Sequence, residues 1–529
     1  MEAAEALGRG NLSTFYEAIR EAARARSRTF WIVAGLTVLA ATLRFATLGA
    51  QAYHHDEIVT ASRVLRDGFW HAMEAVGFSE SAPPLYYALA WVWTQLTGTG
   101  EVGLRSVSAL AGVATVPVAY LLGAELRGRR AGIVAAALVA VNPMLLWYSQ
   151  EARSYALLVL LTAAAALYFV RALHDVPVER GPYGPLSTGT STRRRDTTLW
   201  GVFSALALAT HYFAIFPIAL EAAWLLWRRR REAFAGLWIV LLAGLALGPL
   251  AIHQMSLGHA EWIGDRSLGH RVWEAGVTFV VGETGDIVSR PETVLPAVVP
   301  LLAVLAGLLL LALRADRGER RAGGLMLALV AVTVAGPLAL ALVAPGKDYV
   351  LARNLLPALV PLLVAVAIGA TARHARRSGM VVASVLVAYS LGFCVWVSLS
   401  PAWQRPDWDT VAARLGEPKA PRAIVLWTLG AASLRYYLST GSFQAQSSEG
   451  FAWSVHEVDF VSDGPVPPVP AGSLGPRFHQ VGYEQVGRLY VRRYALPGPA
   501  LAHLRLARVR EADLNFRSNG VLLDGIGPG

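Results

Sequence analysis

Long apolar segments alternate with short arginine clusters along most of the chain, and this pattern predicts a helical membrane protein. About 20 apolar residues cross a bilayer as a helix, and cytoplasmic loops are enriched in arginine and lysine. Placing every cluster on the cytoplasmic side requires two crossings between neighbouring clusters. The clusters are Arg20–Arg28, Arg127–Arg130, Arg193–Arg195, Arg228–Arg231, Arg314–Arg321 and Arg373–Arg377.

The segments between these clusters predict about eleven transmembrane helices. An apolar segment at 84–96 is too short to span and predicts a helix on the outer surface. The first span is longer than the apolar region of a signal peptide, so we expect it to be retained. The predicted spans are 29–50, 105–126, 131–149, 154–173, 197–211, 213–227, 236–252, 293–313, 322–344, 350–370 and 380–399.

Outside these spans, the pattern predicts a cytoplasmic interfacial helix within residues 1–28 and two large outer loops at 51–104 and 253–292. Residues 400–529 are rich in proline and glycine and less apolar, which predicts a small extracytoplasmic α/β domain. The fold class is therefore mostly α, a polytopic domain at 29–399 followed by this α/β domain. Within it we expect strands at 423–429, 454–461 and 487–494 and a helix at 431–438.

The composition is that of a membrane protein. It argues against a nucleic-acid-binding protein and against a fold held by disulfides or a cysteine-based metal site. Hydrophobic residues make up 54% of the 529 residues and charged residues only 16%. The net charge of +10 comes from scattered clusters and not from one basic face, so nucleic acid is not an expected partner. The single cysteine, Cys394, lies in an apolar segment, which excludes a disulfide framework and a cysteine-based metal site.

Four ionisable residues, His54 to Glu57, follow the first predicted helix directly. Ionisable groups at a membrane surface are costly to desolvate and well suited to proton transfer, so they predict an active site. Asp56 is the candidate base. Glu57 either shares this site or caps the following helix, predicted at 58–67, where acids are favoured. His54 and His55 either join Asp56 around a divalent cation, bind the acceptor or are ordinary surface histidines.

Six motifs follow one another along the chain: HHDE at 54–57, PPLYY at 83–87, WYSQEARSYAL at 147–157, THY at 210–212, YVLARNLLP at 349–357 and the segment 403–411. Together they resemble the GT-C glycosyltransferases, in particular the bacterial branch related to protein O-mannosyltransferases and lipid A aminoarabinose transferases. The resemblance covers roughly residues 29–420. It implies transfer of a sugar from a polyprenyl-phosphate carrier, with Asp56 as the catalytic carboxylate of the first loop and Glu151 as the acid of the second. One departure is Ala82, where family members often have histidine or lysine.

Other residues at the outer ends of the predicted helices are candidates for substrate binding. Arginine and lysine suit a phosphate group, so the carrier phosphate is expected near the start of the tenth helix. The alternatives are snorkelling of these basic groups to lipid headgroups, an ion pair between Glu151 and Arg153, and a packed His211. The predicted set is His55, Arg153, Tyr155, His211, Lys347, Tyr349 and Arg353.

The sequence thus predicts an inverting glycosyltransferase of the plasma membrane, hexosyl or pentosyl, with a cytoplasmic N-terminus. Its partners would be a polyprenyl-phosphate-linked sugar, membrane lipids, and an envelope glycan, lipid or protein as acceptor. A divalent cation is the one cofactor left open. A transporter or lipid flippase is the alternative, although ionisable residues crowd the outer helix ends and not the midplane.

Overall fold

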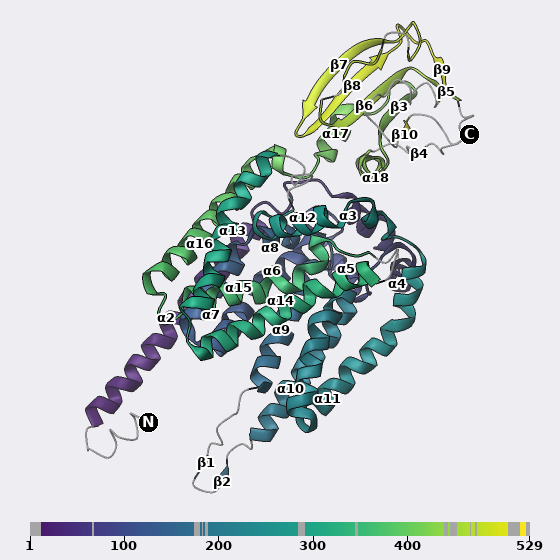
Figure 1. Ribbon diagram of the computed structural model, residues 1–529. Coiled ribbons are helices and arrows are strands. Elements are labelled where there is room, and N and C mark those ends of the chain that lie inside the picture. The colour runs from purple at the N-terminus through teal and green to yellow at the C-terminus, as the bar shows by residue number, and fades with distance from the viewer. Residues whose placement is uncertain are drawn as a thin grey trace. The chain divides into compact units, whose positions relative to one another are not determined.

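The computed structural model divides into two compact units, which are described separately (Figure 1). The helical unit comprises residues 1–46, 73–92 and 105–395, and the loop–sheet unit comprises 47–72, 93–104 and 396–529. The structure describes residues 12–65, 68–173, 180–181, 184–185, 189–283, 291–343, 348–438, 443–444, 452–465, 467–470, 473–505 and 519–524.

Each predicted span coincides with helix in the structure. Among the described residues, eight helices are long and apolar enough to cross a membrane, or nine if the bent pair α7 and α8 is one span. The predicted surface segment is the 13-residue helix α5. The helices are α2 Leu12–Phe45, α4 Phe69–Ser79, α5 Leu85–Thr97, α6 Glu101–Arg127, α7 Arg129–Val141, α8 Pro143–Ser149, α9 Tyr155–Leu173, α10 Gly189–Thr210, η2 Tyr212–Ala214, α11 Ile215–Ser256, η3 Glu261–Asp265, α12 Leu268–Val281, α13 Pro291–Leu313, α14 Arg317–Val343, η5 Ala352–Ala358, α15 Leu359–Ala370 and α16 Arg376–Leu399, with a small strand pair, β1 Arg180–Gly181 and β2 Gly184–Pro185, between α9 and α10.

The count of eight or nine spans is lower than the predicted eleven. The difference arises because α10 begins with a polar stretch and because α11 is counted as one span. α11 is nevertheless two helices, since Arg229 breaks it with non-helical dihedral angles. Both halves lie beside α10. Trp200 Nε1 donates to Glu221 in the first half at 2.7 Å, and a Cβ atom at Gly201 would lie 2.5 Å from the Cα of Gly236 in the second. The chain therefore reverses at the arginine cluster, as the charge pattern predicts.

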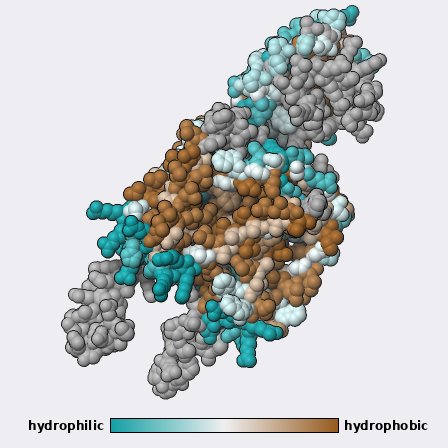
Figure 2. Space-filling model, viewed as in Figure 1, coloured by the Kyte–Doolittle hydropathy of each residue, from teal (hydrophilic) through white to brown (hydrophobic). Residues whose placement is uncertain are grey.

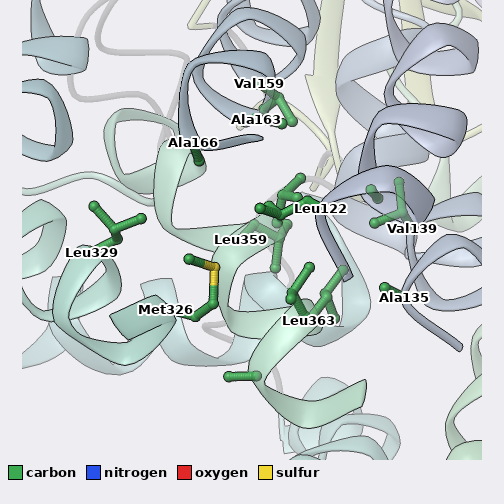
Figure 3. Packing of buried hydrophobic residues seen from close by; sticks show 14 of the residues in the cluster. Leu122, Ala135, Val139, Val159, Ala163, Ala166, Met326, Leu329, Leu359 and Leu363 are labelled. Atoms are coloured by element: carbon green, nitrogen blue, oxygen red, sulfur yellow. The ribbon is translucent and has the colours of Figure 1, made fainter. Parts of the chain in front are cut away.

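Two helices form the centre of the helical unit. In the apolar stretch of η5 and α15, 89% of the residues are buried, and in that of α9 78% are buried, whereas only 22% are buried in those of α14 and α16. Leucine, valine and alanine side chains of α6, α7, α9, α14 and α15 interlock there (Figure 3). The outer surface of the peripheral helices is hydrophobic, and hydrophilic side chains gather near helix ends (Figure 2), as expected for helices that contact lipid.

Contacts between loops place several arginine clusters at one end of the helical unit. Arg127 pairs with Asp316 at 3.1 Å, and the backbone N–H of Arg373 donates to Glu319 at 3.1 Å. Similarly, Arg229 donates to the carbonyl of Leu173 at 3.1 Å. The predicted grouping of these loops on one side agrees with these contacts.

A buried arginine in α2 supports the break between α7 and α8. Pro143 has no N–H, so the helix ends there and the carbonyls of its last turn lack partners. The Arg44 side chain is completely buried and donates to the carbonyl of Ala140 at 3.0 Å and to Ser149 Oγ at 3.1 Å. Cys394 Sγ lies 3.3 Å from the carbonyl of Val141. α7 and α8 meet at 57°.

The loop–sheet unit confirms the predicted C-terminal α/β fold. Its main sheet has six strands in the order β4-β10-β3-β6-β8-β7, with β3 and β6 parallel and the other pairs antiparallel. The predicted strand at 454–461 is two strands, β5 and β6, on either side of His456. The elements are α3 His55–Val59, η1 Thr60–Val64, η6 Pro401–Trp403, α17 Trp408–Leu415, β3 Arg422–Trp427, α18 Thr428–Tyr437, β4 Phe443–Gln444, β5 Ala452–Val455, β6 Glu457–Asp463, β7 His479–Val486, β8 Leu489–Ala495, β9 Ala502–Arg505 and β10 Asn519–Asp524.

The close approach of α10 and α11 yields a prediction. A Cβ atom at Gly236 would lie 2.2 Å from the carbonyl oxygen of Thr197, whereas one at Gly244 of the same helix would meet open space. We expect Gly236→Ala to destabilise the protein by about 1–3 kcal/mol and Gly244→Ala to be neutral or stabilising. Thermal unfolding in detergent measures both, and equal unfolding temperatures would contradict the packing.

Candidate functional site

Asp56 lies in the first turn of α3 with its carboxylate accessible. Its side chain is 21% exposed, and Oδ1 lies 3.1 Å from Nε2 of His55, whose side chain is 29% exposed. His54 precedes the helix in an extended conformation as its N-cap residue. A partly exposed carboxylate held by an imidazole suits a general base that must meet a second substrate.

Glu57 has a different environment from its neighbour. Its side chain is fully buried, and its carboxylate accepts the backbone N–H of His54 at 2.9 Å. This is the reciprocal half of a capping box, in which an acid three residues into the helix satisfies the N-cap amide. The geometry therefore matches the predicted capping alternative. The helix predicted at 58–67 begins earlier, at His55, and passes into a π-helical turn at Thr60–Val64.

The two histidines and Asp56 also form a set of donors for a metal ion. Their ligand atoms lie within 4.8 Å of one another. Burial, together with the neighbouring His55 and Arg405, lowers the pKa of His54 to about 3, against the effect of Asp56 and Glu57. A neutral imidazole is the form that binds metals. Two imidazoles and one carboxylate therefore fit a divalent cation.

In the helical unit, Arg153 pairs with Glu80, a residue that the sequence analysis did not select. Arg153 Nη1 lies 2.7 Å from Glu80 Oε2, and Tyr87 donates to the same oxygen at 2.8 Å. Glu80 is almost fully buried. Glu80 lies three residues before the Pro83-Pro84 pair in an otherwise uncharged segment. This isolated charge is the sequence feature that could have indicated its importance.

An aromatic series brings together three of the predicted binding residues. Tyr155 at the start of α9 contacts the ring of His211 at a centroid distance of 5.7 Å. Phe213 connects His211, at 5.5 Å, with Tyr349, at 5.9 Å. His211 Nδ1 also accepts the backbone N–H of Phe213 at 3.3 Å, so the ring is packed and capped at the start of η2.

Two of the three predicted cations, Arg153 and Arg353, lie near the same series. Arg153 and Arg353 both act electrostatically on the His211 imidazole. The Arg353 guanidinium also lies over the ring of Trp262, 5.6 Å from its centroid. Lys347 lies outside the described residues. The side chain of Asp348 next to it forms an ion pair with Arg271 of α12, which lowers the pKa of that carboxyl.

Glu151 lies in the turn between α8 and α9 and is 5% exposed. The preceding residue anchors this turn, since Gln150 Nε2 donates to the carbonyls of Leu43 and Arg44 at 3.3 and 3.0 Å. The backbone carbonyl of Glu151 accepts the N–H of Arg153 at 2.8 Å. The end of α2 therefore positions the second predicted acid.

Comparison with known proteins relates this part of the chain to a described family. The family model for dolichyl-phosphate-mannose-protein mannosyltransferases matches residues 81–253. The predicted resemblance to the GT-C glycosyltransferases is confirmed. The match contains Glu151, Arg153, Tyr155 and His211, and it contains neither the segment 54–57 nor Arg353. No curated protein matches the chain.

Two solved structures match a large part of the chain at low sequence identity. The apo oligosaccharyltransferase of Archaeoglobus fulgidus is 13% identical, with a TM-score of 0.46, covering 74% of this chain and 58% of that one. ArnT of Cupriavidus metallidurans, bound to undecaprenyl phosphate, is 15% identical, with a TM-score of 0.38, covering 88% of this chain and 98% of that one. The chain thus spans less than two thirds of the archaeal enzyme.

The Glu80–Arg153 pair yields a second prediction. Removing one partner leaves the other charge buried and uncompensated, which costs on the order of 3 kcal/mol. We expect Arg153→Gln and Glu80→Gln each to lower the unfolding temperature in detergent. The double variant should lose less than the sum of the two single variants, because only one interaction is removed. Strictly additive losses would contradict a direct pair.

Proposed function

We propose that this protein is a lipid-linked-sugar-dependent glycosyltransferase of the GT-C type. It moves a hexosyl or pentosyl group from a polyprenyl-phosphate carrier to a hydroxyl of an envelope glycan, lipid or protein. The observation that carries the proposal is the accessible Asp56 carboxylate beside His55, directly after the first apolar helix. The family match at residues 81–253 supports the enzyme class.

In the proposed mechanism, Asp56 accepts the proton of the acceptor hydroxyl as this oxygen attacks the anomeric carbon of the donor. The bond from that carbon to the phosphate breaks, and the polyprenyl phosphate leaves with its electron pair. The single displacement inverts the anomeric configuration. His55, at 3.1 Å, orients the carboxylate. Because Asp56 is partly exposed and Glu57 is buried, Asp56 is the better base.

The donor phosphate is proposed to bind the cations of the helical unit. Arg353 is the principal contact, with Lys347 beside it, because cationic donors stabilise the phosphate oxygens as the bond breaks. Tyr155, His211 and Tyr349 belong to the aromatic series of this region, and Arg153 acts electrostatically on His211. Glu151 is proposed as a supporting acid. The structure with ArnT contains undecaprenyl phosphate, which is consistent with a polyprenyl-phosphate donor here.

A divalent cation, where present, would be held by His54, His55 and one oxygen of Asp56, and the other oxygen of Asp56 would remain the proton acceptor. It would supply positive charge to the leaving phosphate. His54 stays neutral for this role because its pKa is lowered to about 3 by burial.

We further propose a location in the plasma membrane, with the arginine clusters and the N-terminus in the cytoplasm and the C-terminal domain outside. In this orientation the start of α2, within residues 1–28, lies on the cytoplasmic side. Residues 29–399 form the transmembrane domain, and the loops 51–104 and 253–292 are outside with residues 400–529. The grouping of Arg127, Asp316 and Arg373 at one end of the helical unit supports it.

A transporter or flippase is not supported by the ionisable residues inside the helices. Arg44 is bonded to the carbonyl of Ala140, and Glu221 accepts the indole N–H of Trp200. Both are buried between helices and bonded to a neighbouring helix. They therefore serve packing and do not line a substrate path.

The proposed base yields a third prediction. Asp56→Asn keeps the size of the side chain and removes its basicity, so we expect transfer to fall about 10²-fold to 10⁴-fold. The variant should purify and unfold like the wild type. Asp265→Asn, which changes an exposed acid of the loop after α11, is the matched control and should keep full activity. Full activity in Asp56→Asn would exclude Asp56 as the base.

A further inference from the structure

The hydroxyl of Tyr437 connects the two ends of the first outer loop. Tyr437 is the last residue of α18. Its oxygen accepts the backbone N–H of Tyr53 at 2.7 Å and donates to Glu101 Oε1 at 2.7 Å. The hydroxyl of Tyr53 in turn donates to the carbonyl of Thr99 at 2.8 Å. The two ends of a loop that runs from Tyr53 to Glu101 are therefore held to each other and to one residue of the C-terminal domain.

The residues just before His54 are part of the C-terminal fold. Ala52 is 2% exposed and belongs to the same hydrophobic cluster as Trp408, Leu434 and Leu522. The Tyr53 ring contacts Tyr436 edge to face, at a centroid distance of 5.8 Å. The C-terminal domain therefore fixes the backbone that leads into α3.

Arg405 supports the segment 54–57 from the same side. Its backbone N–H donates to Gln51 Oε1 at 3.0 Å. Its guanidinium is almost fully buried, and Nε lies 3.9 Å from Oε2 of the buried Glu57. The same oxygen accepts the backbone N–H of His54 at 2.9 Å. Arg405 therefore lies against the carboxylate group that completes the start of α3.

From these contacts we infer that Arg405 and Tyr437 are positioning residues that hold the first outer loop so that Asp56 is presented to its substrates. Arg405 acts through Glu57 and the N-terminus of α3, and Tyr437 acts through the backbone of Tyr53. This inference rests on the proposed role of Asp56 as base. A catalytic group displaced by about 1 Å can cost on the order of 10²-fold in rate, so these contacts matter for catalysis although neither residue touches the reacting atoms.

The test uses the full-length protein in detergent and an undecaprenyl-phosphate-linked sugar that the wild type turns over. Arg405→Gln and Tyr437→Phe should lower kcat about 10-fold to 10²-fold, with KM for the donor within about twofold because the donor contacts are unchanged. Arg405→Lys keeps the positive charge and should recover much of the loss. A variant that had merely unfolded would lose active protein and would not be rescued in this way.

A double-mutant cycle examines the route through Glu57. If Arg405 acts on Asp56 by way of Glu57, the variant with both Arg405→Gln and Glu57→Gln should be no slower than the slower single variant. Multiplied losses would show that the two residues act independently and would overturn this part of the inference.

Matched controls come from the same domain. Tyr436→Phe removes the hydroxyl next to Tyr437 and keeps the ring contact with Tyr53. Arg493→Gln removes a partly exposed arginine that contacts Asp459, Glu484 and the carbonyl of Arg414. Both should retain wild-type kcat. A loss in Tyr436→Phe as large as that in Tyr437→Phe would contradict a specific role for the bridging hydroxyl.

Hydrogen exchange separates failure of the inference from failure of the proposed function. The amides of Tyr53 and His54 are bonded to Tyr437 and Glu57, so the peptide around residues 51–58 should exchange faster in Tyr437→Phe and Arg405→Gln than in the controls. Unchanged exchange, or unchanged kcat with faster exchange, would overturn the inference even in an active enzyme. If the wild type turns over no donor, the proposed function fails, and exchange alone decides whether the two residues hold the loop.

Discussion

The burial of one arginine in an apolar helix constrains the arrangement around it. Arg44 is completely buried in α2, and a guanidinium in a membrane interior must have its donors satisfied. The broken helix at Pro143 supplies acceptors, because the last carbonyls of α7 have no amide partners from α8. The bonds to Ala140 and Ser149 thus hold α2 against the break. The same contact, with Gln150, determines where the turn that carries Glu151 lies.

The two adjacent acids of the first outer loop show how one short helix separates two roles. Asp56 points to an accessible position beside His55, and Glu57 is buried on the cap of α3 next to Arg405. A buried carboxylate that already accepts an amide is poorly placed to meet an acceptor hydroxyl. Its proposed contribution is to orient Asp56. The C-terminal domain, through Arg405 and Tyr437, therefore has a structural link to the proposed chemistry.

The sequence predicted those features that depend on apolar length and charge, and it missed those that depend on contacts between distant segments. Each predicted span lies largely within helix among the described residues, and the reversal at Arg229 follows from the arginine cluster there. The ion pair between Arg153 and Glu80 joins residues that are far apart in the chain, and no local sequence pattern predicts that these two residues pair. Likewise, the inclusion of Ala52 in the core of the C-terminal domain could not be read from periodicity. The capping role of Glu57 was one of two alternatives, and only burial distinguishes them.

The central claim is that this chain transfers a sugar from a polyprenyl-phosphate carrier. The most direct measurement incubates the purified protein with a panel of polyprenyl-phosphate-linked hexoses and pentoses, together with extracted envelope glycans, lipids or proteins, and follows the release of polyprenyl phosphate. We expect release from at least one donor. This release should require both an acceptor and the Asp56 carboxylate. Release that is equal in the absence of the enzyme, or no release from any donor in the panel, would contradict it.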